Sequence, residues 1–243
     1  MSSTANKTLC VVCGEEVTYS EVAFEVECAL CGKKEMANAA CVSGHYVCDT
    51  CHREKGVDFC IELCRATDST NPIDIINEAM GDKSIFQNGP EHHTLFGAAV
   101  IAAYANAGGL DSEGNHLDKD AALTEMKRRS MQLPGGTCGF WGVCSAAISV
   151  GQALSILNGS TPLKAKPWAQ CQALTSDVLG KLADIGGPRC CKRSGYTAVL
   201  TAVDHVEMDL GVSLDVTDRV TCAFHAGNNE CLKAACPYFP SST

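Results

Sequence analysis

The sequence predicts a mainly α protein, with a helical body preceded by a small, β-rich, zinc-ribbon-like module at the N-terminus. Three observations support this fold class. After residue 66, apolar residues recur mostly at helical spacing. Near the N-terminus, two C-x-x-C-G knuckles flank a Val/Tyr/Phe-rich stretch. Cysteine accounts for 17 of the 243 residues. We therefore predict two domains, a metal-bound head over residues 1–66 and a cysteine-rich helical domain over residues 67–243.

Composition narrows the class of protein. A hydrophobic content of 46% excludes disorder, and a net charge of −9 argues against nucleic acid as a partner. Residues 1–8 lack the apolar core of a signal peptide, and the longest apolar runs, 95–107 and 144–157, are shorter than the ~20 residues that span a bilayer. We expect a cytoplasmic protein without a membrane segment. An odd cysteine count without an export signal favours metal binding over disulfides.

Eight residues of the head have the types and spacing of metal ligands, because paired knuckles present thiolates from tight turns. Sequential pairing is favoured, with the first four ligands on one zinc ion and the last four on another. Crossed pairing stays open, and His52 could replace His45. The ligands are Cys10, Cys13, Cys28, Cys31, Cys41, His45, Cys48 and Cys51.

Two interpretations of the head remain. About 45 residues cannot build a sufficient core, so the ions could simply fold the module; the module could also recognise a partner. Cys60 and Cys64 lie at i, i+4 on a helix predicted over 57–65. They are either packed in apolar surroundings or an additional pair facing a metal.

The body begins after a polar linker, 67–71, where Pro72 suits the first position of a helix. Glycine-rich or Pro-containing turns separate the later helices. A short edge strand is predicted over 212–216. The predicted helices after the one at Pro72 are 94–107, 118–132, 145–158, 169–185 and 191–208.

Three glycine-containing segments, 88–93, 134–144 and 186–193, are expected to meet and form one site. Glycine lets the backbone approach a ligand, and helices that start there present N–H groups to an anionic group such as a thiolate-bound cluster. The tail ends in Cys-Pro, which often closes iron–sulfur ligand runs. We predict an iron–sulfur centre, of the 4Fe–4S type, rather than packed free thiols. Its candidate ligands are Cys138, Cys144, Cys190, Cys191, Cys222, Cys231 and Cys236.

Glu91, His92 and His93 could bind metal, transfer protons or cap a helix. We assign them to catalysis together with Arg189, which like Lys192 and Arg193 would also offset the charge of an anionic cluster. His205, His225 and His116 are expected to be structural or solvated. Phe140 and Trp141 are expected to pack in the core or to shield the cluster from solvent.

The motifs Asn88-Gly-Pro-Glu-His-His, Pro134-Gly-Gly-x-Cys-Gly-Phe-Trp-Gly-x-Cys and Gly186-Gly-Pro-Arg-Cys-Cys-Lys-Arg resemble an uncharacterised domain family of anaerobic bacteria and methanogenic archaea. The head, with Gly44-His-Tyr-Val-Cys-Asp-x-Cys-His, is similar to the zinc-binding head of its members. Members stand alone or are fused to S-adenosylmethionine-dependent methyltransferases. The resemblance implies anaerobic sulfur, methyl or cofactor chemistry and assigns no reaction.

The absence of a nucleotide-binding glycine motif and of hydrolase motifs leaves metal chemistry as the leading hypothesis. We predict an iron–sulfur protein of anaerobic sulfur metabolism that handles a small substrate by sulfur transfer, desulfuration or a lyase reaction. One rival is a zinc-binding adaptor that docks a methyltransferase or another metalloenzyme. Another is a thiol-redox or methyl-acceptor protein that uses Cys190 and Cys191.

Overall fold

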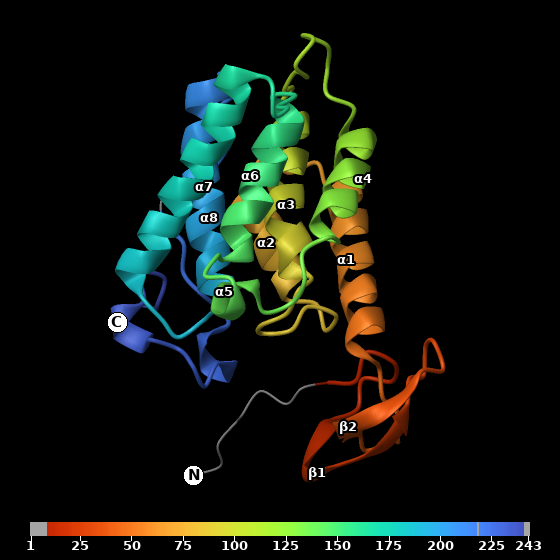
Figure 1. The fold of residues 1–243 in the computed structure, drawn as a ribbon. Coiled ribbons are helices and arrows are strands. Elements are labelled where there is room, and N and C mark those ends of the chain that lie inside the picture. Colours follow the sequence, from red (N-terminus) through yellow and green to blue (C-terminus); the bar gives the residue numbers. More distant parts are fainter. Residues whose placement is uncertain (1–8, 218, 241–243) are drawn as a thin grey trace.

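The computed structural model describes residues 9–217 and 219–240. A two-stranded head lies at one end of a bundle of helices, which confirms the mainly α class (Figure 1). The expectation that residues 1–8 carry no signal peptide falls outside the described residues. Among the residues that are described, no helix is both long and apolar enough to cross a membrane.

The head is an antiparallel hairpin followed by a long helix. Strand β1 (Val17–Glu27) pairs with β2 (Lys34–Cys41), and an irregularity between Tyr19 and Phe24 loops residues out of β1. Helix α1 (Asp49–Ala66) starts in the head and runs along the body, where it packs on α3 and α4. The helix predicted over 57–65 is therefore longer than its apolar pattern indicated.

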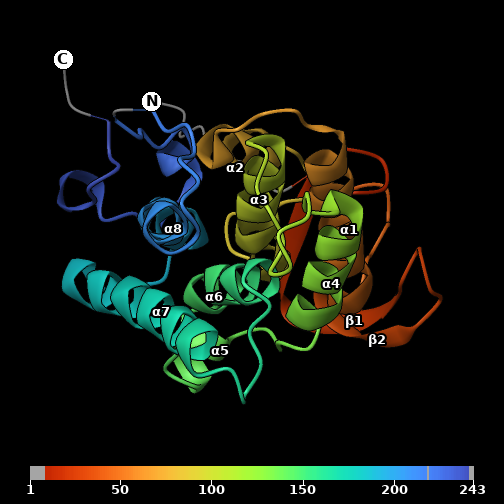
Figure 2. The same cartoon turned by 90° about the horizontal axis from the view of Figure 1, so that it is seen from above.

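Helix α3 is the centre of the body. It contacts α1, α2, α4, α6 and α8, and Figure 2 shows it enclosed by these neighbours. Every residue from His92 to Tyr104 is buried, because a helix apolar on all sides can be stable only inside a bundle. The helices after α1 are α2 (Pro72–Met80), α3 (His92–Asn106), α4 (Lys119–Ser130), α5 (Thr137–Phe140), α6 (Ser145–Leu157), α7 (Ala165–Ile185) and α8 (Cys191–Leu210).

Small residues bring α3 and α6 close together. Gly97 N donates to Ser149 Oγ at 2.8 Å, and a Cβ on Gly97 would lie 2.5 Å from the Ser149 carbonyl oxygen. The contact fixes the position of the two helix starts, His92 and Ser145, which lie in the same part of the body.

The tail after Leu210 has little regular structure. Two 3-10 turns, His225–Gly227 and Lys233–Ala235, are its only helical elements among the described residues. The strand predicted over 212–216 is wrong: the segment is held to the linker by the Asp215 N–H, which donates to Thr70 O at 3.2 Å. Within residues 9–217 and 219–240, the body contains no strand with which this segment could pair.

Cys60 and Cys64 are core residues of the body. Both side chains are fully buried among aliphatic neighbours, and burial raises their pKa values, to about 12 for Cys64. Neither lies in a metal-ligand group of the described residues. Of the two interpretations, the structure supports apolar packing.

Candidate functional site

The head brings its eight predicted ligands together in two groups of four. Within each group, the ligand atoms all lie within 4.8 Å of one another. One group consists of Cys10, Cys13, Cys41 and His45; the other consists of Cys28, Cys31, Cys48 and Cys51.

The distances suit a tetrahedral ion such as zinc. Zn–S bonds of about 2.3 Å imply sulfurs about 3.8 Å apart at the corners of a tetrahedron. The Sγ atoms of Cys13 and Cys41 are 3.8 Å apart, and those of Cys31 and Cys48 are 3.7 Å apart. His45 Nδ1 lies 3.3 Å from Cys13 Sγ, so His45 completes the first group through this nitrogen.

The sequentially paired arrangement is wrong; the pairing is crossed. Val17 pairs with Cys41 at the open end of the hairpin, beside the first knuckle. The second knuckle forms the turn at the opposite end, where Tyr46 bridges with Cys28 and brings the start of α1 to it. The strand ladder therefore separates the two knuckles, and each one takes its remaining ligands from the segment that follows β2.

His52 is not in either group. Its ring stacks on Phe86 with centroids 3.5 Å apart, and it is buried at the junction of head and body. Burial lowers the pKa of His52, although the nearby Glu91 carboxylate opposes this. His52 therefore joins the head to the body and leaves the ligand position to His45.

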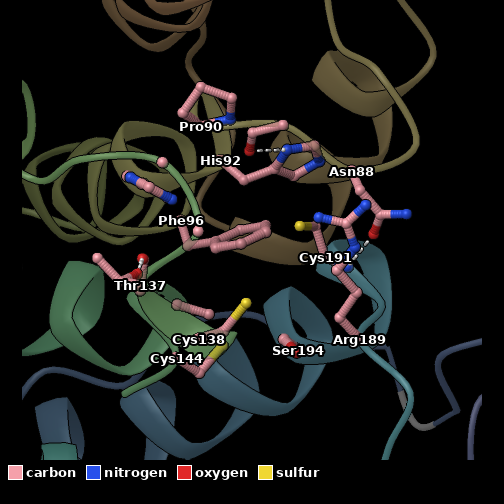
Figure 3. A pocket seen from close by; sticks show the side chains of 16 residues that line it. Asn88, Pro90, His92, Phe96, Thr137, Cys138, Cys144, Arg189, Cys191 and Ser194 are labelled. Carbon is pink, nitrogen blue, oxygen red and sulfur yellow. Dashed lines mark hydrogen bonds between the residues drawn. The ribbon is translucent and has the colours of Figure 1, made fainter. Parts of the chain in front are cut away.

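The three glycine-containing segments meet, as predicted, at a cavity of about 150 Å³ (Figure 3). We call it the central cavity. The sulfurs of Cys138, Cys144 and Cys191, here called the cavity set, face this space around the ring of Phe96. Asn88 Oδ1 accepts a hydrogen bond from Cys191 N at 3.0 Å, which ties two of the segments together.

Helices α3, α6 and α8 all begin at the central cavity. Their first residues, His92, Ser145 and Cys191, are among its lining. Helix N-termini carry partial positive charge and free N–H groups, and Arg189 adds a full positive charge to the same lining. The cavity therefore favours an anionic occupant.

Two glycines are required by the shape of the cavity. Gly136 has φ of 78° in the turn before α5, a conformation that side-chain-bearing residues rarely adopt. A Cβ on Gly195 would lie 2.1 Å from the Phe96 ring, so only glycine lets this ring pack against α8. Phe140 and Trp141, expected to pack in the core or to shield a cluster, do not pack in the core: they are exposed over 88% and 62% of their surface.

Behind the cavity wall, Glu91, His92 and Lys192 form a buried chain of hydrogen bonds. His92 Nδ1 lies 3.0 Å from Gly89 O and 3.2 Å from Glu91 Oε1, two acceptors, so this nitrogen carries the proton. His92 Nε2 then accepts from Lys192 Nζ at 3.2 Å, and Lys192 also donates to Phe86 O at 2.8 Å.

Within this series of hydrogen bonds, the buried negative and positive charges compensate each other. Burial, the largest single influence, would raise the pKa of Glu91, but the hydrogen bond and charge interaction with His92, a backbone N–H and nearby His52 together outweigh it and leave this pKa lowered. Burial, and next the charge of Lys192, lowers the pKa of His92, and burial lowers the pKa of Lys192 to about 8. A carboxylate and an ammonium group thus lie on either side of a neutral imidazole. The sequence indicated Lys192 only as a neighbouring charge.

The predicted catalytic residues differ in their access to the cavity. His92, His93 and Arg189 line it, whereas Glu91 is fully buried and does not. Burial lowers the pKa of His93 to about 4, and its Nδ1 has no partner among the described residues. His93 is therefore a neutral imidazole in the wall of the cavity, and its Nδ1 is a buried polar atom without a partner.

The other four candidate ligands gather elsewhere, at the junction of α8 and the tail. Cys190, Cys222, Cys231 and Cys236, here called the tail set, line a separate hollow of about 10 Å³. The expectation of one centre, held by three or four of these seven cysteines, is therefore corrected to two separate sets: consecutive residues Cys190 and Cys191 face different spaces.

The remaining histidines have ordinary surroundings. His205 lies between two carboxylates, 3.5 Å from Asp177 and 3.6 Å from Asp209. His225 packs edge-on against Phe239 beside the tail set, at a centroid distance of 4.9 Å. His205 thus fits the expected structural role.

Comparison with known proteins identifies a family but no characterised relative. No curated protein and no solved structure matches the chain. A profile of DUF5714, described as a family of unknown function, matches residues 60–239. The match begins inside α1 and includes helices α2 to α8, the cavity set and the tail set. The chain therefore belongs to the DUF5714 family.

Proposed function

We propose that the body holds a thiolate-bound metal centre of the iron–sulfur type at the central cavity and acts on a small anionic or sulfur-containing substrate there. The observation that carries the proposal is the convergence of three cysteines and two histidines on a cavity at which three helices begin. Sulfur transfer, desulfuration and lyase reactions are the classes that such a site suits.

The donor set fits this group. Cys138, Cys144 and Cys191 supply three thiolates, and a centre with three protein ligands keeps one position open. Three helix N-termini and Arg189 offset the negative charge of the thiolates and of the centre. When bound, the centre would supply a Lewis acid at that open position.

The size of the cavity limits the substrate. An apolar cavity of ~150 Å³ accommodates a molecule about as large as benzene, and the central cavity has this volume before any centre occupies part of it. The substrate is therefore small, and its anionic group is expected to lie toward Arg189 and the helix N-termini.

The polar residues would have separate roles. His93 lines the cavity as a neutral imidazole and would form part of the wall against which a substrate packs. His92 has both ring nitrogens engaged, so it is a positioning residue held by Glu91 and Lys192. Arg189 orients the substrate anion and is within 3.7 Å of Glu230, an exposed pair that a substrate could displace.

The test is metal analysis of the full chain purified without oxygen. We expect iron and acid-labile sulfide in addition to about two zinc ions, with a visible absorption spectrum. Cys138→Ser, Cys144→Ser and Cys191→Ser should each alter the spectrum or lower the iron content. Cys171→Ser, which removes a buried thiol outside both sets, should do neither.

Substrate access is tested with sodium sulfide as the probe. Sulfide should perturb the spectrum of the iron-loaded protein, and Arg189→Gln should weaken this response several-fold without loss of iron. A colourless protein that contains no iron after anaerobic purification would overturn the proposal.

An adaptor role is the second candidate, because the head exposes apolar side chains. Tyr19, Val22, Met36 and Val42 are each more than 60% exposed on the hairpin and the turn that follows it. A partner of this kind, such as a methyltransferase, would bury that face. About two zinc ions per chain, with no iron and no sulfide, would favour the adaptor over the iron–sulfur protein.

A further inference from the structure

The tail set is built from two distant parts of the chain. Cys190 is the N-cap of α8, and the other three cysteines come from residues 222–236, a segment with little regular structure. The segment is fastened to α8 by the Tyr238 ring, which lies 5.2 Å from that of Tyr196. Cys222 N also donates to Tyr238 O at 2.8 Å.

The sulfurs of the tail set receive N–H donors, which stabilise the thiolate form. Asn228 Nδ2 lies 3.4 Å from Cys190 Sγ, and Phe224 N lies 3.4 Å from Cys222 Sγ. Lys233 N lies 3.3 Å from Cys231 Sγ. Hydrogen bonds of this kind to sulfur are among the features that set the reduction potentials of iron–sulfur clusters.

The four thiols are close enough to interact electrostatically. Burial raises the pKa of Cys222, and the nearby Cys190, Cys236 and Cys231 raise it further. Four converging thiolates repel one another unless a cation binds among them. Besides the four cysteines, the lining of the hollow is largely apolar and includes Phe224, Tyr238 and Phe239.

The spacing distinguishes the tail set from the two head groups. In the head, four ligand atoms lie within 4.8 Å of one another, as a single ion requires; no three ligand atoms of the tail set meet this limit. A polynuclear cluster places its thiolates on different iron atoms, so its ligands are farther apart than those of one ion.

We propose that Cys190, Cys222, Cys231 and Cys236 hold a second iron–sulfur cluster, coordinatively closed and separate from the centre at the central cavity. This inference extends the iron–sulfur assignment of the proposed function but does not require the cavity centre to exist. The cluster fastens the tail to the start of α8. Because Cys190 precedes Cys191, one peptide unit connects the two sites.

The experiment compares single variants of the full chain, purified without oxygen, for iron, sulfide and zinc per chain. Cys231→Ser and Cys236→Ser should each remove the iron of one cluster, about half of the total when both centres are filled, and leave zinc unchanged. Cys138→Ser should leave the tail cluster in place, and the double variant Cys138→Ser/Cys231→Ser should lose nearly all iron. Cys171→Ser is the matched control.

Each failure has its own signature. If Cys138→Ser has no effect while Cys231→Ser removes iron, the cavity centre fails and the tail cluster stands. The tail cluster is overturned if Cys231→Ser and Cys236→Ser keep all iron, if either removes the same iron as Cys138→Ser, or if a third zinc ion is lost instead.

A milder variant, which keeps all four cysteines, separates the loss of a cluster from misfolding of the protein. Asn228→Asp keeps Oδ1, which accepts from Glu230 N at 2.9 Å, but replaces the N–H donor to Cys190 with a negative charge. The iron content should be retained, and the midpoint potential of one cluster should become more negative. An unchanged potential in an iron-replete variant would count against a cluster at Cys190.

Discussion

The head and the body both collect cysteines, but they do so in different ways. In the head, the turn before β1, the hairpin, the segment after β2 and the start of α1 supply all eight candidate ligands within 42 residues, already at the spacing of a tetrahedral ion. In the body, cysteines from 138 to 236 are brought together by helix packing and divide into two wider sets. We therefore expect the head to depend on metal for its fold, whereas the body has a large apolar core of its own.

This difference shows that the spacing of cysteines along the sequence is informative in the head but not in the body. Spacing identified the candidate ligands of the head because adjacent turns supply them. It did not show which later residues bind the same ion as each knuckle. In the body, thiols of similar appearance serve three purposes. Cys64 is packed in the core, Cys191 faces a cavity, and Cys190 faces the tail.

The largest expected effect concerns the head. With crossed pairing, Cys13→Ser/Cys41→Ser damages one site and should cost one zinc ion, whereas Cys13→Ser/Cys31→Ser damages both and should cost two. Metal binding contributes on the order of 10 kcal/mol per structural site, so the second variant should unfold the head. Zinc quantitation and proteolysis would show this, while circular dichroism should show that most helix remains. The reverse zinc counts would restore sequential pairing.

The next effect concerns the buried charges of the body. Lys192→Met leaves the Glu91 carboxylate without its counter-charge, and we expect a loss of about 3–5 kcal/mol in the free energy of unfolding. Glu91→Gln/Lys192→Met should be more stable than Lys192→Met alone, because the pair is coupled through His92. Denaturant unfolding of the metal-loaded proteins measures both. Additive losses would show that the chain of hydrogen bonds does not couple them.

A smaller effect tests the packing behind the central cavity. In Gly195→Ala the new methyl group would overlap the Phe96 ring, and overpacking of this kind costs about 1–3 kcal/mol. Gly180→Ala is the control, since its Cβ would meet nothing within 4 Å and alanine favours helix by about 0.5–1 kcal/mol. Thermal unfolding should shift down for the first and up for the second. Equal shifts would mean that the ring is not constrained by α8.

A last effect, of about the same size, separates a packed thiol from a ligand. Cys64→Ser places a hydroxyl group in the core of the body and should cost about 1–3 kcal/mol, with zinc and iron per chain unchanged. Cys48→Ser, at a head ligand, should instead lose zinc and leave the core intact. A loss of metal in Cys64→Ser would return Cys64 to the set of ligands.

Much of the fold could be predicted from the sequence because its helices are marked locally. Pro72 and the Asn71 cap begin α2, and Asn71 Oδ1 accepts from Ile73 N at 2.9 Å as an N-cap should. Helix α3 starts two residues before its predicted first residue, and α7 starts four residues before it. The strand predicted over 212–216 failed because strand propensity requires a partner, and the described body offers none.

What the sequence by itself determined was local: the helical periodicity, the eight candidate ligands of the head, and the three glycine-containing segments that line the central cavity. Spacing along the chain carries this information because turns and helix starts involve neighbouring residues. Tertiary structure alone decided the crossed pairing, the division of Cys190 and Cys191 between two sites, and the link from Glu91 through His92 to Lys192. These features depend on which elements pack side by side. That packing is determined by the burial of apolar surface over the whole chain.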